Sequence, residues 1–143
     1  MASLSDPKVL RRFILYLGML TFVMFGVWSF WGTFVETPDG DFEVRAGDIH
    51  LTGREYEEAI EDFNKALVVQ PNHRGALLGK AAALIQLQRF DDAEQVLNHA
   101  IRYLTKNLDP DDPTGRGALA AAYGNRGIIH DTQGRYEQAL EDY

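Results

Sequence analysis

The stretch YEEAIEDFNKAL, residues 56–67, decides the fold, because FDDAEQVLNHAI follows it at residues 90–101 with the same pattern. Aromatic, alanine and apolar positions recur between the two stretches at a constant spacing of 34 residues. A third and shorter copy, YEQALEDY, occupies residues 136–143. A fixed period in this range is the sequence signature of a repeat architecture.

These copies resemble the tetratricopeptide repeat, a helix–turn–helix unit of about 34 residues. The resemblance covers about 100 residues and implies an all-α fold, an α-solenoid of helix–turn–helix repeats. Small residues let the two helices of a unit approach closely, and an aromatic residue fills the space beside the turn. The first helix of each unit has its small residue at Gly47, Ala81 and Gly127, the second helix has its small residue at Ala59, Ala93 and Ala139, and the aromatic residues are Tyr56, Phe90 and Tyr136.

The repeats are predicted at about 41–73, 74–107 and 120–143. The second unit does not end in proline as the first does at Pro71, and the third unit is displaced by 12 residues. An acidic loop rich in proline and glycine is therefore predicted at 108–116. The third unit stops within its second helix, so we expect that edge to rest on further sequence or on a partner.

An apolar run precedes the repeats. From Phe13 to Val35 there is no charged residue, and a helix of this length spans roughly 35 Å, enough for a hydrocarbon core of about 30 Å. A transmembrane helix is predicted at 13–35, between an N-terminal segment at 1–12 and a short linker at 36–40. A cleaved signal peptide is the competing interpretation, but no small-x-small cleavage site follows the run.

The charges that flank the run predict its orientation. Basic residues precede it and acidic residues follow it, which places the N-terminus in the cytoplasm and, in a bacterium, the repeats in the periplasm. Small residues of the run fall within an arc of roughly 140°, a face on which another transmembrane helix can pack closely. This small-residue face comprises Gly18, Thr21, Gly26, Ser29, Gly32 and Thr33.

The resemblance also implies a binding groove lined mainly by the first helix of each unit. The predicted groove residues are Val44, Asp48, Leu51, Leu78, Ala82, Ile85, Gln86, Ile128 and Asp131. Family members that clamp the carboxylate of chaperone tails use lysine, arginine and asparagine there, but Asp48 stands where asparagine is expected and Gly75 where lysine is expected. The groove is predicted to be apolar with acidic rims, suited to a helix or extended segment with apolar anchors and basic residues. The alternative is that it is only the concave side of a scaffold with contacts elsewhere.

Charge and composition exclude several classes of function. Residues 1–35 carry a net charge of +2 and the remainder −9, so clustered lysine and arginine for nucleic acid are missing from the repeats. There is no cysteine, the four histidines show no metal-binding spacing, and DPDDP at 109–113 lacks the EF-hand pattern. Because no catalytic or phosphate-binding motif appears, we expect no enzyme activity, no cofactor and no metal.

Two functions fit these features. The first is a non-enzymatic scaffold anchored in a bacterial inner membrane, an accessory or assembly subunit of a respiratory, photosynthetic or secretion complex. The predicted linker of five residues reaches at most roughly 18 Å, which confines the repeats to partners in or on the same membrane. The second is a chaperone-like or import-type receptor that captures basic, amphipathic client segments.

Overall fold

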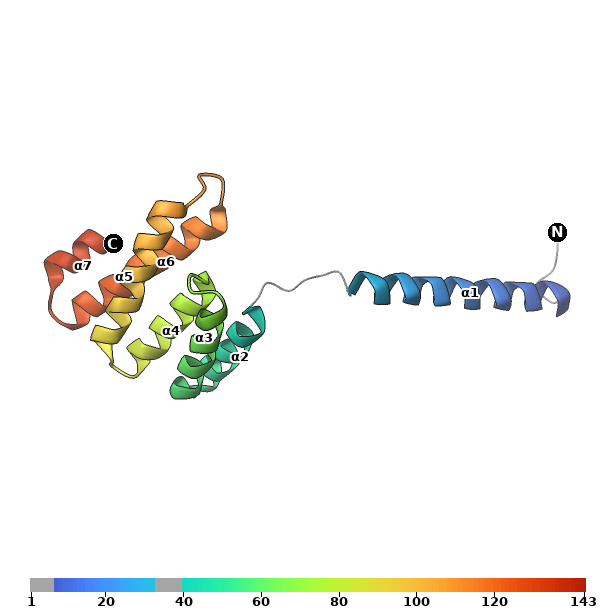
Figure 1. The fold of residues 1–143 in the computed structure, drawn as a ribbon, viewed down its shortest axis with the longest axis horizontal. Helices are drawn as coiled ribbons and strands as arrows, with labels where there is room; N and C mark the ends of the chain where they lie inside the picture. The colour runs from blue at the N-terminus through green and yellow to red at the C-terminus, as the bar shows by residue number, and fades with distance from the viewer. Residues whose placement is uncertain (1–6, 33–39) are drawn as a thin grey trace. The chain divides into compact units, whose positions relative to one another are not determined.

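The computed structural model describes residues 7–32 and 40–143, and the chain divides into two compact units at residues 37 and 38. The first unit contains helix α1 (Pro7–Gly32), and the second contains six helices (Figure 1). The all-α prediction is confirmed, since every element in the described ranges is a helix.

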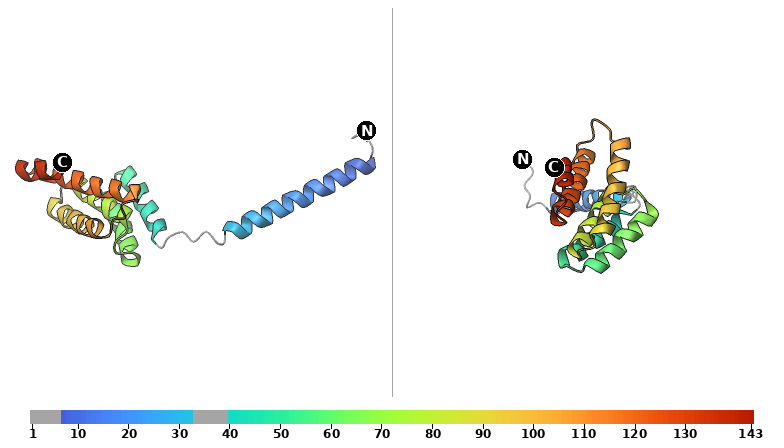
Figure 2. Two further views of the ribbon diagram at one scale, coloured as in Figure 1. Left: turned by 90° about the horizontal axis from the view of Figure 1, so that it is seen from above. Right: turned by 90° about the vertical axis from the view of Figure 1, so that its left-hand side faces the viewer.

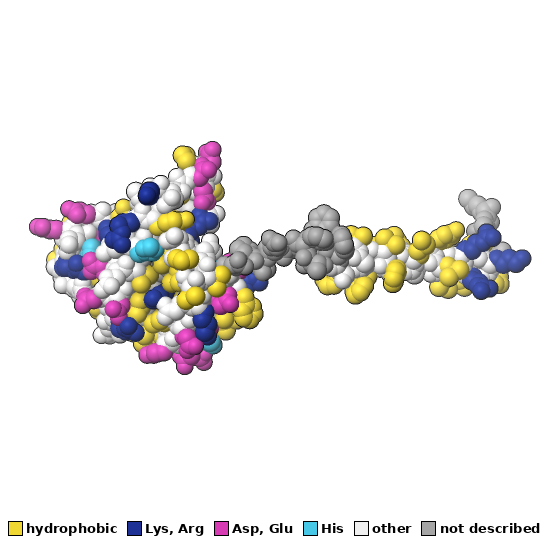
Figure 3. Space-filling model, viewed as in Figure 1, with side chains coloured by type: hydrophobic (Ala, Val, Ile, Leu, Met, Phe, Trp, Pro, Cys, Tyr) yellow, Lys and Arg dark blue, Asp and Glu magenta, His cyan; other side chains and the backbone are white. Residues whose placement is uncertain are grey.

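Helix α1 leaves its apolar side chains uncovered. From Pro7 to Ser29 it is long and apolar enough to cross a membrane, although a signal sequence near an N-terminus meets the same criterion. None of that span is buried, and Figure 3 shows hydrophobic side chains along it with basic side chains at its N-terminal end. The Thr21 hydroxyl donates to the backbone oxygens of Leu17 and Gly18, so this polar group is satisfied within the helix.

Four of the six residues of the small-residue face have described surroundings. A Cβ atom added at Gly18 or Gly26 would meet nothing within 4 Å, so both positions are open to a neighbouring helix. Thr21 and Ser29 lie on the exposed surface of the same helix. Gly32 is the last residue of α1, and Thr33 lies outside the described residues.

The second unit is a right-to-left succession of helix pairs in Figure 1, and Figure 2 shows the same pairs from two other sides. Successive helices pack against each other, and the first helices of the three pairs also contact in a row, α2 with α4 and α4 with α6. This is the arrangement of an α-solenoid. The helices are α2 (Asp41–Gly53), α3 (Tyr56–Val69), α4 (Arg74–Gln86), α5 (Phe90–Asn107), α6 (Pro113–Thr132) and α7 (Tyr136–Asp142).

The turns within the three pairs share one backbone geometry. Arg54, Gln88 and Gly134, which are equivalent positions of the repeat, all have positive φ angles, of 63°, 58° and 73°. In each turn the following backbone N–H donates to the carbonyl five residues earlier, as in a Schellman motif. Only the third turn uses glycine, the residue that adopts this conformation without strain.

The small positions predicted from the repeat are where the helices meet. Ala59, Ala93 and Ala139 are buried, and Phe63 of α3 is fully buried among α2, α3 and α4. Its ring lies against Gly47 of α2 and Gly79 of α4, where an added Cβ would come within 2.7 Å and 2.3 Å of ring carbons. Close approach of three helices at this ring therefore depends on glycine.

The 12-residue displacement of the third repeat comes mainly from longer helices. Helix α5 has 18 residues against 14 in α3, and α6 has 20 against 13 in α4, which together account for eleven of the twelve. The connecting loop is correspondingly shorter than the predicted 108–116 and spans 108–112. Helix α6 starts early because Asp112 caps it, with Oδ1 accepting from Gly115 N–H at 2.8 Å, and Pro113 is pre-set for the first helical position.

Candidate protein-binding surface

The row formed by α2, α4 and α6 positions the predicted groove residues along one continuous set of contacting helices. Leu78 and Ile85 of α4 pack together on the core cluster shared by α4, α5 and α6, and Leu51 of α2 packs on the neighbouring cluster around Phe63. Val44 is buried within that second cluster, so it supports the surface from beneath. The other predicted groove residues divide into the half-buried Ala82 and the exposed Asp48, Gln86, Ile128 and Asp131.

Two exposed carboxylates, Asp48 of α2 and Asp131 of α6, give the row of first helices an acidic character. Partial burial raises the pKa of Asp48 above its ordinary value, and the nearby His73 acts in the opposite direction. Asp131 lies on the exposed side of α6. A segment with apolar and basic side chains matches half-buried leucine and isoleucine beside exposed carboxylates.

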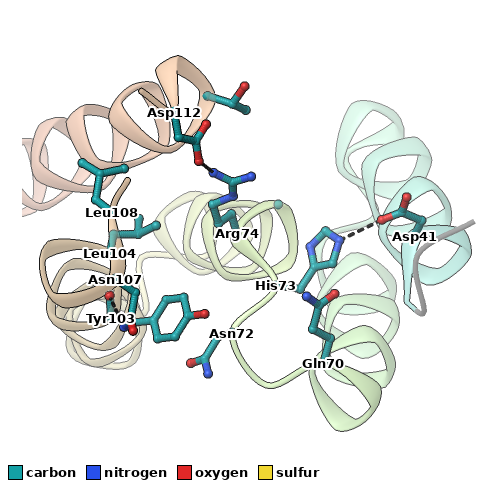
Figure 4. Close-up of a pocket in the computed structure, with 12 residues that line it drawn as sticks. Asp41, Gln70, Asn72, His73, Arg74, Tyr103, Leu104, Asn107, Leu108 and Asp112 are labelled. Carbon is teal, nitrogen blue, oxygen red and sulfur yellow. Dashed lines mark hydrogen bonds and ion pairs between the residues drawn. The ribbon is translucent and has the colours of Figure 1, made fainter. Parts of the chain in front are cut away.

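A pocket of about 580 Å³ opens at one edge of the solenoid, beside the α3–α4 and α5–α6 connections (Figure 4). Its apolar wall comes from Tyr103, Leu104 and Leu108 at the end of α5 and in the loop that follows. Its polar lining comes from the start of α2, the α3–α4 turn with the start of α4, the end of α5, and the start of α6 with its N-cap: Asp41, Gln70, Asn72, His73, Arg74, Asn107, Asp112 and Thr114.

A histidine–carboxylate contact within the first repeat and an arginine–carboxylate ion pair hold this edge together. His73 Nε2 lies 2.9 Å from Asp41 Oδ1, and Arg74 Nη1 donates to Asp112 Oδ2 at 2.5 Å (Figure 4). The Gly115 backbone N–H and then the Arg74 guanidinium lower the pKa of Asp112. Two of the lining amides are engaged as well, since Asn72 Oδ1 lies 2.8 Å from His99 Nε2 and Asn107 Nδ2 donates to the Tyr103 backbone oxygen at 2.7 Å. The polar lining is therefore held mainly by contacts within the protein.

The sequence did not reveal this pocket, because its residues come from four separate segments of the chain. One signal was present: Asp112 followed by Pro113 is the same helix-start pattern as Asp6 followed by Pro7. Applied at 112, that pattern indicates a helix that starts at Pro113 with Asp112 as its N-cap, and it removes residues 113–116 from the predicted loop. The ion pair with Arg74, 38 residues away, has no local signal.

His50 and His130, which occupy equivalent positions of the first and third repeats, form a repeated motif with carboxylates. His50 Nδ1 lies 3.0 Å from Asp62 Oδ2, and His130 Nδ1 lies 3.1 Å from Asp142 Oδ2. These are ion-pair distances, although neither nitrogen is aligned with its carboxylate for a hydrogen bond. The second repeat has Leu84 and Val96 at the equivalent positions, so an apolar contact replaces the polar one there.

Around His130 the second and third repeats share a polar network. Arg126 of α6 donates to Asp142 of α7 and, at 2.6 Å, to Asn98 of α5. Arg135 donates to Glu94 Oε2 at 2.5 Å, and His130 Nε2 lies 3.4 Å from Glu94 Oε1. Hydrogen bonding from Arg135, followed by that from His130, lowers the pKa of Glu94 against the effect of burial. The network is structural, because its arginine–carboxylate pairs join the second and third repeats.

Within residues 7–32 and 40–143, no group of three or more histidine, aspartate and glutamate side chains is placed to hold a metal ion. The features of the described surface are the row of helices α2, α4 and α6, the exposed carboxylates on that row, and the pocket at the edge of the solenoid.

Comparison with known proteins identifies the repeat. Models of the tetratricopeptide repeat match residues 44–113 and residues 120–143. The chain is 30% identical over 97 residues to heat shock protein STI1 of Saccharomyces cerevisiae. That match covers 66% of this chain but only 15% of the length of the yeast protein.

Solved structures show the same fold. The Arabidopsis OM64 TPR domain superposes with a TM-score of 0.61 and 22% sequence identity, covering 73% of this chain and 76% of that chain. The second TPR of Spaghetti (RPAP3), bound to the HSP90 peptide SRMEEVD, superposes with a TM-score of 0.60 and 20% identity. It covers 73% of this chain and 86% of that one.

Proposed function

We propose that this chain, which belongs to the tetratricopeptide repeat family, is a membrane-anchored scaffold for a protein partner in the same membrane. The tetratricopeptide repeat is a protein-interaction fold. The repeats supply the binding surface, and α1 supplies the anchor. The partner is an inner-membrane complex of a bacterium, to which this protein is an accessory or assembly subunit without enzyme activity of its own.

Helix α1 carries this proposal. Its apolar side chains are uncovered by any other described residue, and its length matches the hydrocarbon core of a bilayer. Transfer of such a surface from water into lipid is favourable by about 25 cal/mol for each Å² of apolar area. The sequence after the run offers no small-x-small cleavage site, which supports a retained anchor over a removed signal.

Flanking charge supports the orientation. Lys8, Arg11 and Arg12 lie at the N-terminal end of α1, and acidic residues dominate the chain after it. The N-terminus is then cytoplasmic and the repeats are periplasmic. The short connection between α1 and α2 keeps the repeats near the membrane surface.

Alkaline carbonate extraction of native membranes tests the anchor. The full chain should remain in the membrane pellet, because an integral helix is not released when ionic contacts are broken. A version with charged residues at Leu17 and Phe25, both exposed on α1, should move to the soluble fraction while retaining the helical spectrum of its repeats. Release of the unmodified chain would contradict the proposal.

A client receptor is the second candidate, and the acidic character of the repeats favours it. The chain beyond residue 35 has a net charge of −9, which attracts basic segments. Binding of such segments should weaken steeply between low and high salt, since exposed charges are screened over about 8–10 Å. Salt-resistant, stoichiometric association with one complex would instead favour the scaffold.

A further inference from the structure

Helix α2 presents an exposed face that combines apolar side chains with one basic side chain. Phe42 and Ile49 lie seven residues apart on this face and are 79% and 71% exposed. Arg45 and Gly53 lie on the same side of the helix and are also exposed. At about 100° per residue, the carboxylates of α2 project roughly 90° or more away from this outer face. The outer face is defined by Phe42, Arg45, Ile49 and Gly53, and the carboxylates are those of Asp41, Glu43 and Asp48.

The neighbouring helices leave the outer face uncovered. Among the described helices, α2 packs only against α3 and α4. Gly47 lies against the Phe63 ring of α3, and Val44 comes within 3.3 Å of a Cβ built at Gly75 of α4. Both contacts use the side of α2 opposite the outer face. The large apolar side chains of the outer face therefore need another surface to cover them.

The side chains of the outer face do not suit a helix packed in the manner of the repeat. Within the solenoid the equivalent face meets the preceding helix, and there α4 has the small residues Ala76 and Gly79. An added Cβ at Gly79 would come within 2.3 Å of the Phe63 ring. Helix α2 has Phe42 and Arg45 at these two positions, which are too large for the same close approach. A fluid lipid surface, in contrast, accommodates a bulky apolar side chain beside a long cation.

We propose that the outer face of α2 lies on the lipid surface of the membrane that holds α1. Phe42 and Ile49 enter the boundary between headgroups and acyl chains, and the Arg45 guanidinium binds lipid phosphate oxygens. Arg45 is exposed and has no ion pair with another described residue, so its charge is available for this contact. The inference rests on the proposed membrane anchor, since it names the surface on which the anchored repeats lie.

The length of the chain before α2 and the charge of α3 both favour this contact. Helix α1 ends at Gly32 and α2 begins at Asp41, so the eight residues between them reach at most about 28 Å. Helix α2 is thus the helix of the second unit that the chain tethers most closely to the bilayer. Exposed glutamates on α3, the next helix, are repelled by anionic lipid, so charge selects the outer face of α2. These glutamates are Glu57, Glu58 and Glu61.

A fluorescent label on the outer face tests the contact, because the chain has no cysteine of its own. The full chain with Gly53→Cys carries a bimane label and is reconstituted alone into vesicles of phosphatidylethanolamine and phosphatidylglycerol. A Cβ at position 53 meets only the Glu55 side chain, at 3.7 Å or more, so the label leaves the other outer-face side chains in place. We expect brominated acyl chains to lower its fluorescence about twofold or more, and aqueous iodide to have little effect, because an interfacial helix is immersed at the acyl boundary. The reverse is expected for a label at Asn64→Cys, an exposed position on α3.

The two quenchers give a distinct result for each alternative. Quenching at position 53 by iodide alone places the outer face in water, and protection from both quenchers means that a second copy or another part of this chain covers it. Either result overturns the proposal. A label at Phe22→Cys, an exposed position on α1, reports the anchor separately. Lipid quenching at position 22 without lipid quenching at position 53 overturns only this inference, whereas no lipid quenching at position 22 overturns the membrane anchor and this inference together.

Substitutions show which side chains make the contact. In the labelled Gly53→Cys chain, Phe42→Ser with Ile49→Ser should remove most of the lipid quenching, whereas Val68→Ser, at an 83% exposed valine on α3, should retain it. Arg45→Glu should lower the ratio of lipid-bound to free α2 about fivefold or more, and Arg45→Lys should preserve it. Circular dichroism checks that each variant keeps its helices. Unchanged lipid quenching in the double variant or in Arg45→Glu, or an equal loss in Val68→Ser, overturns the proposal.

Discussion

The ring of Phe63 lies directly against Gly79, so closely that a Cβ at position 79 would come within 2.3 Å of the ring Cζ. We therefore expect Gly79→Ala to destabilise the repeats. The usual helix-propensity gain of alanine over glycine, about 0.5–1 kcal/mol, is outweighed by overpacking, which costs about 1–3 kcal/mol in a core. Thermal unfolding of the full chain in detergent, followed by circular dichroism, measures the difference.

Gly124→Ala is the matched control, because a Cβ at that position of α6 meets nothing within 4 Å. It should leave stability unchanged or raise it by up to about 1 kcal/mol. Equal effects of the two substitutions would contradict the packing described around Phe63.

A second prediction concerns the turn at Gln88, whose φ of 58° lies in the left-handed region. Gln88→Gly should stabilise the repeats by up to about 1 kcal/mol, because glycine adopts this conformation without a Cβ penalty. The reverse change at the equivalent third-repeat position, Gly134→Gln, should destabilise them. Chemical denaturation gives both values, and a lower midpoint for Gln88→Gly would show that its side chain matters more than its backbone.

A third prediction follows from the lowered pKa of Glu94, which results first from its hydrogen bond to Arg135. A carboxyl group whose folded-state pKa is below its ordinary 4.5 stabilises the folded protein above that pH, and the contribution is lost as pH falls through the folded-state pKa. Glu94→Gln should thus cost about 1 kcal/mol at pH 7, reduced by partial exposure, and less than that at pH 3.

Melting temperatures of both proteins at pH 7 and pH 3 provide this comparison. Glu141→Gln, an exposed position on α7, is the control and should behave alike at both pH values. If Glu94→Gln lowers the melting temperature as much at pH 3 as at pH 7, the Glu94 side chain stabilises the fold through its shape and not through its charge.

Much of the solenoid was predictable because packing requires small residues at fixed positions. Ala59, Ala93 and Ala139 mark the second helices, and Tyr56, Phe90 and Tyr136 are the first residues of α3, α5 and α7. A constraint that recurs every 34 residues is visible in a single sequence.

The features that the sequence left unpredicted depend on contacts between distant residues. Gly79 was not singled out, since its neighbour Phe63 approaches from another helix. The pairing of Arg74 with Asp112 and the burial of Val44 likewise follow from how helices stack and not from local pattern. The groove residues remain a prediction.

A fourth prediction separates this chain from relatives that bind chaperone tails. Asp48 and Gly75 stand where such clamps are expected to have asparagine and lysine, so the acidic peptide SRMEEVD should show no saturable binding to this chain. The double variant Asp48→Asn, Gly75→Lys removes one negative charge and adds a positive one, and it should gain measurable affinity. Isothermal titration with the second TPR of Spaghetti (RPAP3) as positive control makes the comparison, and binding by the unmodified chain would refute it.

Under the proposed function, a retained apolar helix holds a protein-binding repeat domain against one membrane complex. Affinity purification of the tagged full chain from native membranes in mild detergent, with a high-salt wash and quantitative mass spectrometry, tests it most directly. We expect one set of membrane proteins to co-purify in stoichiometric amount and to stay bound through the high-salt wash. Recovery of the chain without any other protein in comparable amount, or with many partners that salt removes, would contradict it.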